Sequence, residues 1–265
     1  MTIPNIIMSS IPKIIHYCWF GRKPLPDMAI KCISSWKKYF PDYEIKEWNE
    51  DNFDINIVPY TTEAYSVNKY AFVSDYARLY ILYKYGGLYF DTDVEVIRNM
   101  DHIIHKGPFM GYEHDPIVDD NKFGEVALGL GLGIPSEDPL IKQILDYYNT
   151  IHFINPDGSF SNETIVTITT NLLKQQGLKV LDGIQVIQGI YIYPKEFFCP
   201  KDYVTGKLHI TDNTISIHHY GASWYPWYAK LEMHLSHLLG ISYRDFLHRN
   251  VPKINNFFKN KFNRK

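Results

Sequence analysis

The sequence contains little cysteine and no long apolar run. Only three of its 265 residues are cysteines, and neither their odd number nor their spacing suggests a disulfide framework or a metal site. We expect Cys18, Cys32 and Cys199 to be buried thiols. No run of about 20 apolar residues is present, and residues 1–10 lack the features of a secretory signal. These absences predict a cytoplasmic protein without a membrane-spanning helix.

Internal repeats, low-complexity linkers and a dinucleotide-binding fingerprint are also absent. Gly129, Gly131 and Gly133 alternate within a mid-chain strand pattern, but no GxxG turn into a helix follows them. We expect these glycines to permit close backbone approach or packing. The chain is long enough for one sizeable domain, which we place at residues 1–240, followed by an appendage at residues 241–265. Strands alternating with helices predict a three-layer α/β fold with a mixed sheet, whose ligands bind at the strand ends.

Three helices have clear signals in the sequence. Asp27 can cap a helix that runs to about residue 39, with Ile30 on its apolar face. Ser136 can start a second helix over residues 139–148, with acidic residues in its first turn. A third helix is expected from about residue 227 to residue 239.

Charge is distributed unevenly along the chain. The net charge is only −2, yet residues 244–265 carry seven basic side chains, one acidic side chain and four phenylalanines. Such a segment can dock on an anionic membrane surface, or it can form a solvated, frayed end. We expect no nucleic-acid partner. Aromatic residues make up 15% of the whole chain, and most of them should fill the core.

Two carboxylates one residue apart are the most informative feature of the sequence. Residues 88–96 have the pattern of a single strand, and its period of two places Tyr89, Asp91, Asp93 and Glu95 on one face. Burial of unpaired carboxylates is costly, so this strand should end at water, an ion or a polar ligand. Oxygen ligands of this kind suit Mg²⁺ or Mn²⁺, which commonly bridge a protein carboxylate to a diphosphate.

A helical pattern precedes this strand directly. Residues 69–85 carry apolar side chains at spacings of three and four, and Gly86 and Gly87 follow as a stop signal. Asp75 and Arg78 lie three residues apart on one face of the predicted helix. Taken alone, they fit a surface ion pair that contributes less than about 1 kcal/mol.

The segments SDYARL at 74–79 and GGLYFDTD at 86–93 together resemble the donor-site signature of glycosyltransferases with a sugar-binding region containing a DxD motif. That family includes bacterial capsular and lipopolysaccharide transferases, yeast initiating α-1,6-mannosyltransferases and the glucosylating domains of large clostridial toxins. The segment IIHYCWFG at 14–21 is similar to the first strand of the family, and IHHYGASW at 217–224 is similar to its C-terminal element. Arg22 stands where many members have a second glycine.

The resemblance implies a GT-A type fold, a nucleotide-sugar donor such as a UDP-sugar, a divalent Mn²⁺ or Mg²⁺ cofactor and retention at the anomeric carbon. By the same resemblance, Asp93 binds the metal, and Asp91 contacts the ribose, the sugar or a metal-bound water. Arg78 acts with these two aspartates as a catalytic residue, because a metal and an arginine stabilise charge that builds up on a leaving diphosphate. The donor-binding residues that the resemblance implies are Trp19, Ser74, Asp75, Arg78, Tyr89, Asp91, Ser223 and Trp224.

Two assignments stay open at this stage. His218 and His219 alternate across their strand, so only one of them can face the site; we place His219 at the metal and His218 as its packed partner, although either histidine suits the pattern. Both could also be satisfied structural histidines. Trp19 fits core packing as well as base stacking, and its position just before a glycine turn favours stacking.

Other classes of protein also use paired aspartates. A haloacid-dehalogenase-type phosphatase requires Thr or Val two residues after its second aspartate, where this chain has Glu95. A binding module could use Asp91 and Asp93 only to hold an ion. We expect a hexosyltransferase that acts on a glycan acceptor in surface polysaccharide synthesis. The basic, phenylalanine-bearing tail and the resemblance together suggest a lipid-linked acceptor and contact with the inner face of the membrane. A mannosyl- or glucosyltransferase acting on protein is the alternative.

Overall fold

The computed structural model describes residues 10–221 and 227–246, without the side chain of Trp227. The predicted donor-binding residues Ser223 and Trp224 lie outside the described residues, as does most of the predicted tail. The chain forms two compact units. The larger one contains Met1–Pro200 and Ile210–His219, and the smaller one contains Lys201–His209 and Tyr220–Lys265.

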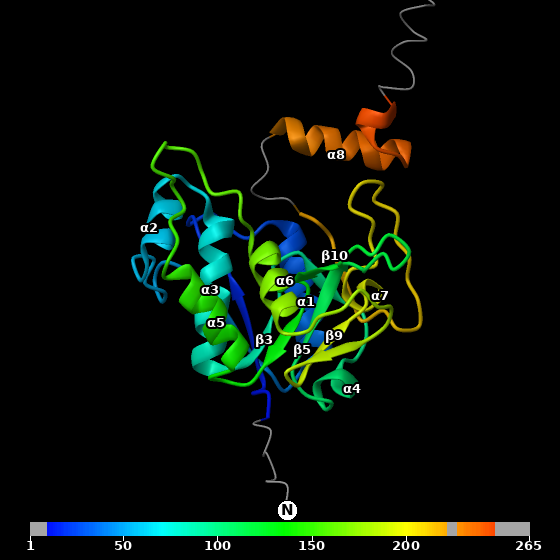
Figure 1. Ribbon diagram of the computed structural model, residues 1–265, viewed down its shortest axis with the longest axis horizontal. Coiled ribbons are helices and arrows are strands. Elements are labelled where there is room, and N and C mark those ends of the chain that lie inside the picture. The colour runs from blue at the N-terminus through cyan, green and yellow to red at the C-terminus, as the bar shows by residue number, and fades with distance from the viewer. Residues whose placement is uncertain (1–9, 222–226, 247–265) are drawn as a thin grey trace, which may run out of the picture. The chain divides into compact units, whose positions relative to one another are not determined.

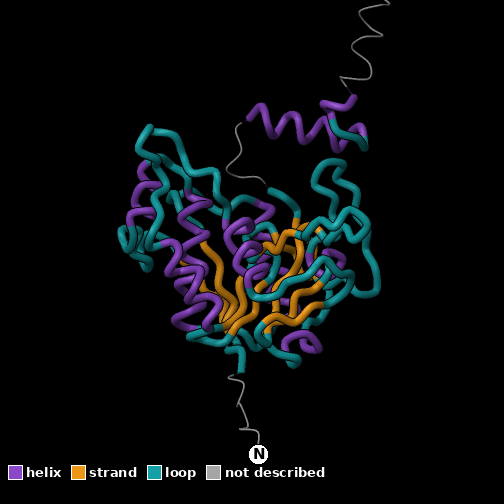
Figure 2. The backbone as a smooth tube through the Cα atoms, in the orientation of Figure 1, coloured by secondary structure: helices purple, strands orange, loops and turns teal. Residues whose placement is uncertain are grey.

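A large mixed sheet forms the centre of the larger unit (Figures 1 and 2). Its strand order is β2-β1-β3-β7-β5-β9-β8, and β6 pairs with β5. Strand β1 runs parallel to β2 and β3, whereas β7 runs antiparallel to β3 and β5. The bounds are β1 Ile14–Cys18, β2 Glu44–Trp48, β3 Gly87–Tyr89, β5 Phe109–His114, β6 Glu125–Ala127, β7 Leu132–Ile134, β8 Gln185–Ile187 and β9 Ile190–Tyr193.

Helices cover both faces of this sheet. Successive side chains of a strand point to opposite faces, so neighbouring residues of β1 contact helices on different sides of the sheet. On β1, the ring of Tyr17 lies 5.7 Å from that of Trp36 in α1, Asp27–Tyr39. The neighbouring His16 ring lies on the other face, 6.3 Å from Tyr85 of α3, Tyr70–Tyr85. The fold is therefore the three-layer α/β fold with a mixed sheet that the sequence predicts. The other helices of this unit are α2 Pro59–Ser66, α4 Asp101–Ile104, α5 Pro139–Tyr148, α6 Ile165–Gln175 and α7 Lys195–Phe198.

Aromatic side chains fill much of the core. The largest fully buried ones include Trp36, whose indole Nε1 donates to the carbonyl of Val94 at 2.7 Å. A buried tryptophan needs a hydrogen-bond acceptor for its indole N–H, and this bond provides one. None of the three cysteines forms a disulfide, and all three are buried, as predicted. The other aromatic side chains less than 2% exposed are Tyr60, Tyr89, Tyr112, Tyr148, Tyr193, Phe90, Phe109, Phe153 and Phe198.

The single strand expected over residues 88–96 is in fact two strands joined by a turn. Strand β3 belongs to the large sheet, whereas β4, Val94–Val96, pairs antiparallel with β10, Ser216–His218, in a separate two-stranded sheet. Between them the amide of Val94 donates to the carbonyl of Asp91 at 3.0 Å, which closes a four-residue turn. Aspartate is a turn-forming residue, and the strand prediction gave this preference too little weight.

The smaller unit contains α8, Trp227–Leu239, at the bounds that the sequence predicts. Within this unit, a ring nitrogen of His237 lies 3.1 Å from the carbonyl oxygen of Tyr203, which links α8 to the segment 201–209. Across the described residues, no helix combines the length and the apolar character needed to cross a membrane.

Candidate functional site

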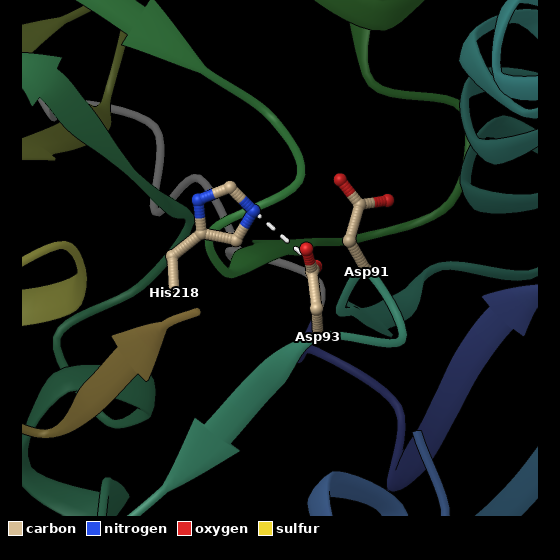
Figure 3. Close-up of side chains that lie close together, drawn as sticks. All are labelled: Asp91, Asp93 and His218. Carbon is tan, nitrogen blue, oxygen red and sulfur yellow. Dashed lines mark ion pairs between the residues drawn. The ribbon is translucent and has the colours of Figure 1, made fainter. Parts of the chain in front are cut away.

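Asp91, Asp93 and His218 converge where the turn between β3 and β4 meets the end of β10 (Figure 3). One ligand atom from each side chain lies within 4.8 Å of the other two. The Nε2 atom of His218 lies 3.2 Å from Oδ1 of Asp93. Each of the three side chains is partly buried. Residues far apart in the sequence thus bring two carboxylates and an imidazole to one point.

Arg78 connects the first aspartate to the preceding helix. Its Nη2 atom lies 2.9 Å from Oδ1 of Asp75 and 3.0 Å from Oδ1 of Asp91. The hydroxyl of Tyr89 donates to the same Oδ1 of Asp91 at 3.1 Å, and the guanidinium lies 4.9 Å from the centre of the Tyr89 ring. Arg78 is only 5% exposed, so this network is not a surface ion pair. The guanidinium of Arg78 therefore pairs with two carboxylates in a largely buried environment, where electrostatic interactions are strong.

Burial shifts the pKa values in this network. Desolvation raises the pKa of Asp75 to about 6, although the nearby Arg78 opposes that change. Desolvation also disfavours the charged form of Arg78, but Asp91, Tyr89 and Asp75 outweigh it, and the pKa of Arg78 rises above its usual range. Burial likewise raises the pKa of Tyr89 well above its ordinary value. Arg78 is thus a permanent cation, and Tyr89 stays a neutral hydrogen-bond donor.

The second aspartate faces a histidine. Burial would lower the pKa of His218, but the adjacent carboxylate of Asp93 outweighs it and raises that pKa well above the usual value. His219 lies differently: its ring Nε2 is 2.7 Å from Oε2 of Glu95, and its backbone amide donates to the carbonyl of Asp93 at 2.9 Å. Lys31 contacts the same Oε2 of Glu95 at 3.0 Å. Within the described residues, the structure places His218, and not the expected His219, beside both carboxylates.

The pairing of β10 with β4 explains which histidine faces the site. His218 lies opposite Val94, and Ile217 lies opposite Glu95. Antiparallel partners share a face, so His219 falls on the face of Ile217 and Glu95, whereas His218 falls on the face of Val94. Asp93 lies in the turn before β4, outside this alternation, and its carboxylate meets His218. The sequence pattern could separate the two histidines into opposite faces, but it could not supply this register. Glu95 and Lys31 were not predicted to support the site; Glu95 shared a predicted face with Asp93, whereas nothing in the local sequence indicated Lys31.

Trp19 lies on the rim of a pocket and not in the core. The pocket has a volume of about 300 Å³, and its lining also includes Arg22 and Asp51. The indole Nε1 of Trp19 donates to the carbonyl of Lys23 at 2.6 Å, which fixes the ring on the loop after β1. Arg22 has a φ of 53°, in the left-handed region that glycine adopts most easily. This conformation is a physical reason for a glycine at the corresponding position in many members of the resembled family.

Ser74 takes part in the helix itself. Its hydroxyl donates to the carbonyl of Tyr70 at 3.2 Å, and its own carbonyl accepts from Nε of Arg78 at 3.3 Å. Ser74 therefore supports the orientation of Arg78 through its backbone. Asp75, Arg78, Tyr89 and Asp91 form one connected group, and this group meets Asp93 and His218 at the turn.

The donor set fits a divalent cation. Carboxylates and water suit Mg²⁺ and Mn²⁺, and a neutral imidazole is a common additional ligand for transition metals. The three ligand atoms are already close enough to share one ion, and they come from a turn and a strand end held by backbone pairing. The residues therefore form a group that could hold a metal, and the chemistry of the three side chains does not identify the ion.

Comparison with known proteins gives concordant results. Residues 26–110 match the family described as "Glycosyltransferase sugar-binding region containing DXD motif". Inositol phosphoceramide mannosyltransferase 3 of Schizosaccharomyces pombe is 34% identical over 105 residues, which cover 37% of this chain and 28% of the relative. Inositol phosphoceramide mannosyltransferase 1 of the same yeast is 26% identical over 121 residues, which cover 42% of this chain and 36% of the relative. The chain thus spans about a third of the length of these curated relatives.

Two solved structures of glycosyltransferases are weakly similar in shape. PaToxG glycosyltransferase has a TM-score of 0.44 and 17% identity over 64% of this chain and 71% of that chain. Galactosyltransferase LgtC, solved with donor and acceptor sugar analogues, has a TM-score of 0.42 and 17% identity over 86% of this chain and 95% of that chain. Likeness at this level does not establish a shared fold. The family match confirms the resemblance in the sequence, because residues 26–110, which include Asp91 and Asp93, match the glycosyltransferase sugar-binding region with its DXD motif.

Proposed function

We propose that this protein is a metal-dependent glycosyltransferase of GT-A type that transfers a hexose from a nucleotide sugar to a glycan acceptor. The observation that carries the proposal is the convergence of Asp91, Asp93 and His218 within 4.8 Å, beside the buried cation of Arg78. Asp91, Asp93 and Arg78 lie inside the matched DXD region. Positive charge and metal ligands at one place suit a substrate that carries a diphosphate.

The cation would be held by Asp93 and His218, with Asp91 as a further ligand or as a contact to a bound water. When bound, Mn²⁺ or Mg²⁺ would neutralise negative charge that develops on a leaving diphosphate. His218 would have to be neutral to act as a ligand, so metal binding would release its proton. Arg78 holds Asp91 in place and contributes a fixed positive charge to the site.

The proposed donor subsites follow from the same geometry. The pocket beside the half-buried Trp19 would offer its indole ring to a flat base for stacking. Asp75 and Asp91 offer carboxylate oxygens to the hydroxyl groups of a ribose or a sugar. A UDP-sugar donor and retention at the anomeric carbon follow from the family resemblance and are parts of the proposal.

Replacement of Asp93 by Asn is the main test. We expect Asp93→Asn to abolish Mn²⁺-dependent hydrolysis and transfer of the donor and to leave the unfolding temperature nearly unchanged, because the amide is of similar size but lacks the charge. Asp120→Asn is a matched control, since Asp120 is exposed and lies outside the site. Full activity of Asp93→Asn would refute the proposal.

Screening of substrates separates the proposal from its alternatives. Thermal shifts should be measured with UDP-glucose, UDP-galactose and GDP-mannose, each with MnCl₂. A donor at 100 times its dissociation constant adds about 2.7 kcal/mol to the stability of the fold. A phosphatase would instead turn over phosphate monoesters, and a binding module would hydrolyse neither class of compound.

The sugar and the acceptor are the finer part of the proposal. The family resemblance supports hexose transfer in surface polysaccharide synthesis. The curated relatives are named as mannosyltransferases of inositol phosphoceramide, which favours mannose transfer to a lipid-linked acceptor as a second candidate. Transfer to a protein is the remaining alternative. Product analysis with radiolabelled GDP-mannose and UDP-glucose would distinguish these donors.

A peripheral membrane contact is a further part of the proposal. Tyr228, Leu231 and Leu238 of α8 are 61%, 50% and 71% exposed, and their spacing places them on one side of the helix. The basic and aromatic residues at 244–265 continue this segment in the sequence. Apolar side chains combined with basic ones favour the surface of an anionic membrane, which would place the enzyme near a lipid-linked acceptor at the inner face of a membrane.

A further inference from the structure

The three alternating glycines of residues 129–133 make room for different neighbours. A Cβ atom on Gly131 would lie 3.1 Å from the ring of Phe90, and one on Gly133 would lie 2.2 Å from the ring of Phe109. Both of those neighbours belong to the core. A Cβ atom on Gly129 would instead lie 1.8 Å from Oδ2 and 2.6 Å from Cγ of Asp91. One glycine of the series therefore adjoins the site and not the core.

Space alone requires glycine at position 129. Gly129 is not among the glycines with positive φ, so its backbone conformation is open to any residue. No real Cβ atom approaches a carboxylate oxygen as closely as 1.8 Å, so alanine would force Asp91 to move. The backbone of Asp91 is also tied to this position, because its amide donates to the carbonyl of Gly129 at 2.9 Å.

Other contacts prevent the Asp91 side chain from moving freely. Among the described residues, both of its polar contacts use Oδ1, which faces Nη2 of Arg78 at 3.0 Å and the hydroxyl of Tyr89 at 3.1 Å. A displaced carboxylate would lose these contacts in a partly buried place, where an uncompensated charge is costly. Oδ2 is the oxygen that remains for a ligand, and it is also the oxygen that lies over Gly129.

We propose that Gly129 is a positioning residue for Asp91. The missing side chain allows the carboxylate to lie against the backbone, with Oδ1 bound to Arg78 and Tyr89 and with Oδ2 available to a cation or a donor hydroxyl. The identity of that ligand rests on the proposed function, whereas the steric relation between Gly129 and Asp91 does not. A methyl group at position 129 displaces Oδ2 and weakens cation binding without touching the cation itself.

The first test is Gly129→Ala with Mn²⁺ as the probe. We expect a 10- to 100-fold loss of Mn²⁺ affinity, measured by electron paramagnetic resonance of free Mn²⁺, as is typical when a group that orients a ligand is changed. Gly131→Ala is the matched control two residues away. Gly131 has a φ of 150°, which strains alanine, and the methyl group also meets the ring of Phe90. We therefore expect a lower unfolding temperature but an Mn²⁺ affinity within twofold of the unmodified protein. Unchanged Mn²⁺ affinity in Gly129→Ala would overturn the proposal.

The second test is a double-mutant cycle with Asp91→Ala, read out as the unfolding temperature without metal. The added methyl group fits the space that the carboxylate leaves, so Gly129→Ala should lower the unfolding temperature much less in the Asp91→Ala background than in the unmodified protein. If Gly129→Ala alone does not fold, recovery of folding in the double variant supports the proposal in the same way. Equal losses in both backgrounds would overturn it. Failure of the unmodified protein to bind Mn²⁺ would count against the metal in the proposed function, and this cycle would still decide the role of Gly129.

Discussion

Two histidines in different regions of the larger unit, His16 fully buried and His218 partly buried, have opposite electrostatic surroundings. His16 lies inside the sheet and is 1% exposed. Its Nε2 atom lies 3.0 Å from the carbonyl oxygen of Gly86, and its Nδ1 accepts from the indole of Trp48 at 3.1 Å. Burial lowers the pKa of His16 to about 4, so it is neutral near pH 7. At the turn, the charge of Asp93 instead raises the pKa of His218 well above its usual value.

Burial disfavours the charged form of both rings, so the opposite directions of their pKa shifts come from their partners. Inside the sheet, the neutral imidazole of His16 pairs with neutral groups, and it joins β1, β2 and the end of α3. At the turn, Asp75 and Asp91 share the guanidinium of Arg78, and Asp93 pairs with His218. A neutral histidine can be held in place by hydrogen bonds alone, whereas a cluster of side chains with more carboxylates than positive groups attracts a cation.

Removal of Arg78 should give the largest effect at the turn. Arg78→Ala leaves Asp75 and Asp91 partly buried without a counter-charge, which costs about 3–5 kcal/mol of unfolding free energy. Urea denaturation would measure this loss. Arg22→Ala is the control, because Arg22 pairs with Asp51 at 3.0 Å on the surface and should cost less than about 1 kcal/mol. Similar losses in the two variants would show that the network at the turn is not the stabilising interaction described here.

The pH dependence of stability should reveal the neutral histidine inside the sheet. The pKa of His16 is about 4 in the folded protein and near its ordinary value of 6.5 when unfolded, so the unfolded chain binds more protons between these values. Stability is lost as the pH falls from about 6.5 to about 4, by about 3 kcal/mol at 1.36 kcal/mol for each pH unit. Asp75 has the opposite effect on stability. Because burial raises its pKa to about 6, it favours the folded protein as the pH falls. The difference between the protein and His16→Gln, measured by urea denaturation at several pH values, isolates His16; equal slopes would contradict this account.

Replacement of each adjacent histidine should separate the two roles at the turn. We expect His218→Ala to lower Mn²⁺ affinity by more than about 100-fold, because a ligand is lost. His219→Ala should lower it by about 10-fold, since that ring contacts Glu95 beside the proposed ligands. Titration with MnCl₂, followed by electron paramagnetic resonance, would measure both values. The reverse order would restore the original assignment of His219 as the ligand.

Removal of residues 244–265 should have the smallest effect on the site. Donor hydrolysis should stay within about twofold, because the lost ion pair of Arg244 with Glu232 is exposed and contributes little. Transfer to a lipid-linked acceptor in anionic vesicles should fall, because each basic side chain near such a surface contributes about 1 kcal/mol. Co-sedimentation with vesicles of phosphatidylserine and phosphatidylcholine would measure binding directly. Unchanged transfer and binding would exclude a membrane role for this segment.

The sequence predicts regular elements best where boundary residues are clear. The helix expected to begin at Asp27 ends at Tyr39, and the helix at Pro139–Tyr148 was predicted with the same bounds. Finer details were wrong: Asp138, and not Ser136, caps the latter helix by accepting from the amide of Leu140 at 2.9 Å. Ile30 is 52% exposed although we expected it on the buried face of its helix. Which side of a helix is buried depends on how the helix packs on the sheet. The spacing of apolar residues predicts that side only approximately.

The sequence predicted only those parts of the site that lie close together along the chain. Asp91 and Asp93 are adjacent in sequence to the helix that carries Arg78, so their association follows from a short segment. The approach of Gly129 depends on the pairing of β3 with β7, and the choice of His218 depends on the register of β10 with β4. Strand pairing over long separations is set by the whole core, and a residue pattern cannot supply it.

The turn at Asp91–Val94 also determines what a bound ion would do to the chain. Asp91 follows the large sheet, Asp93 leads into β4, and His218 ends a strand whose next residue contacts Glu95 across 124 positions of sequence. A cation shared by these side chains would act as a removable cross-link that closes this long loop. Its binding energy would then add to the pairing of β10 with β4, much as a disulfide would, but under the control of metal concentration.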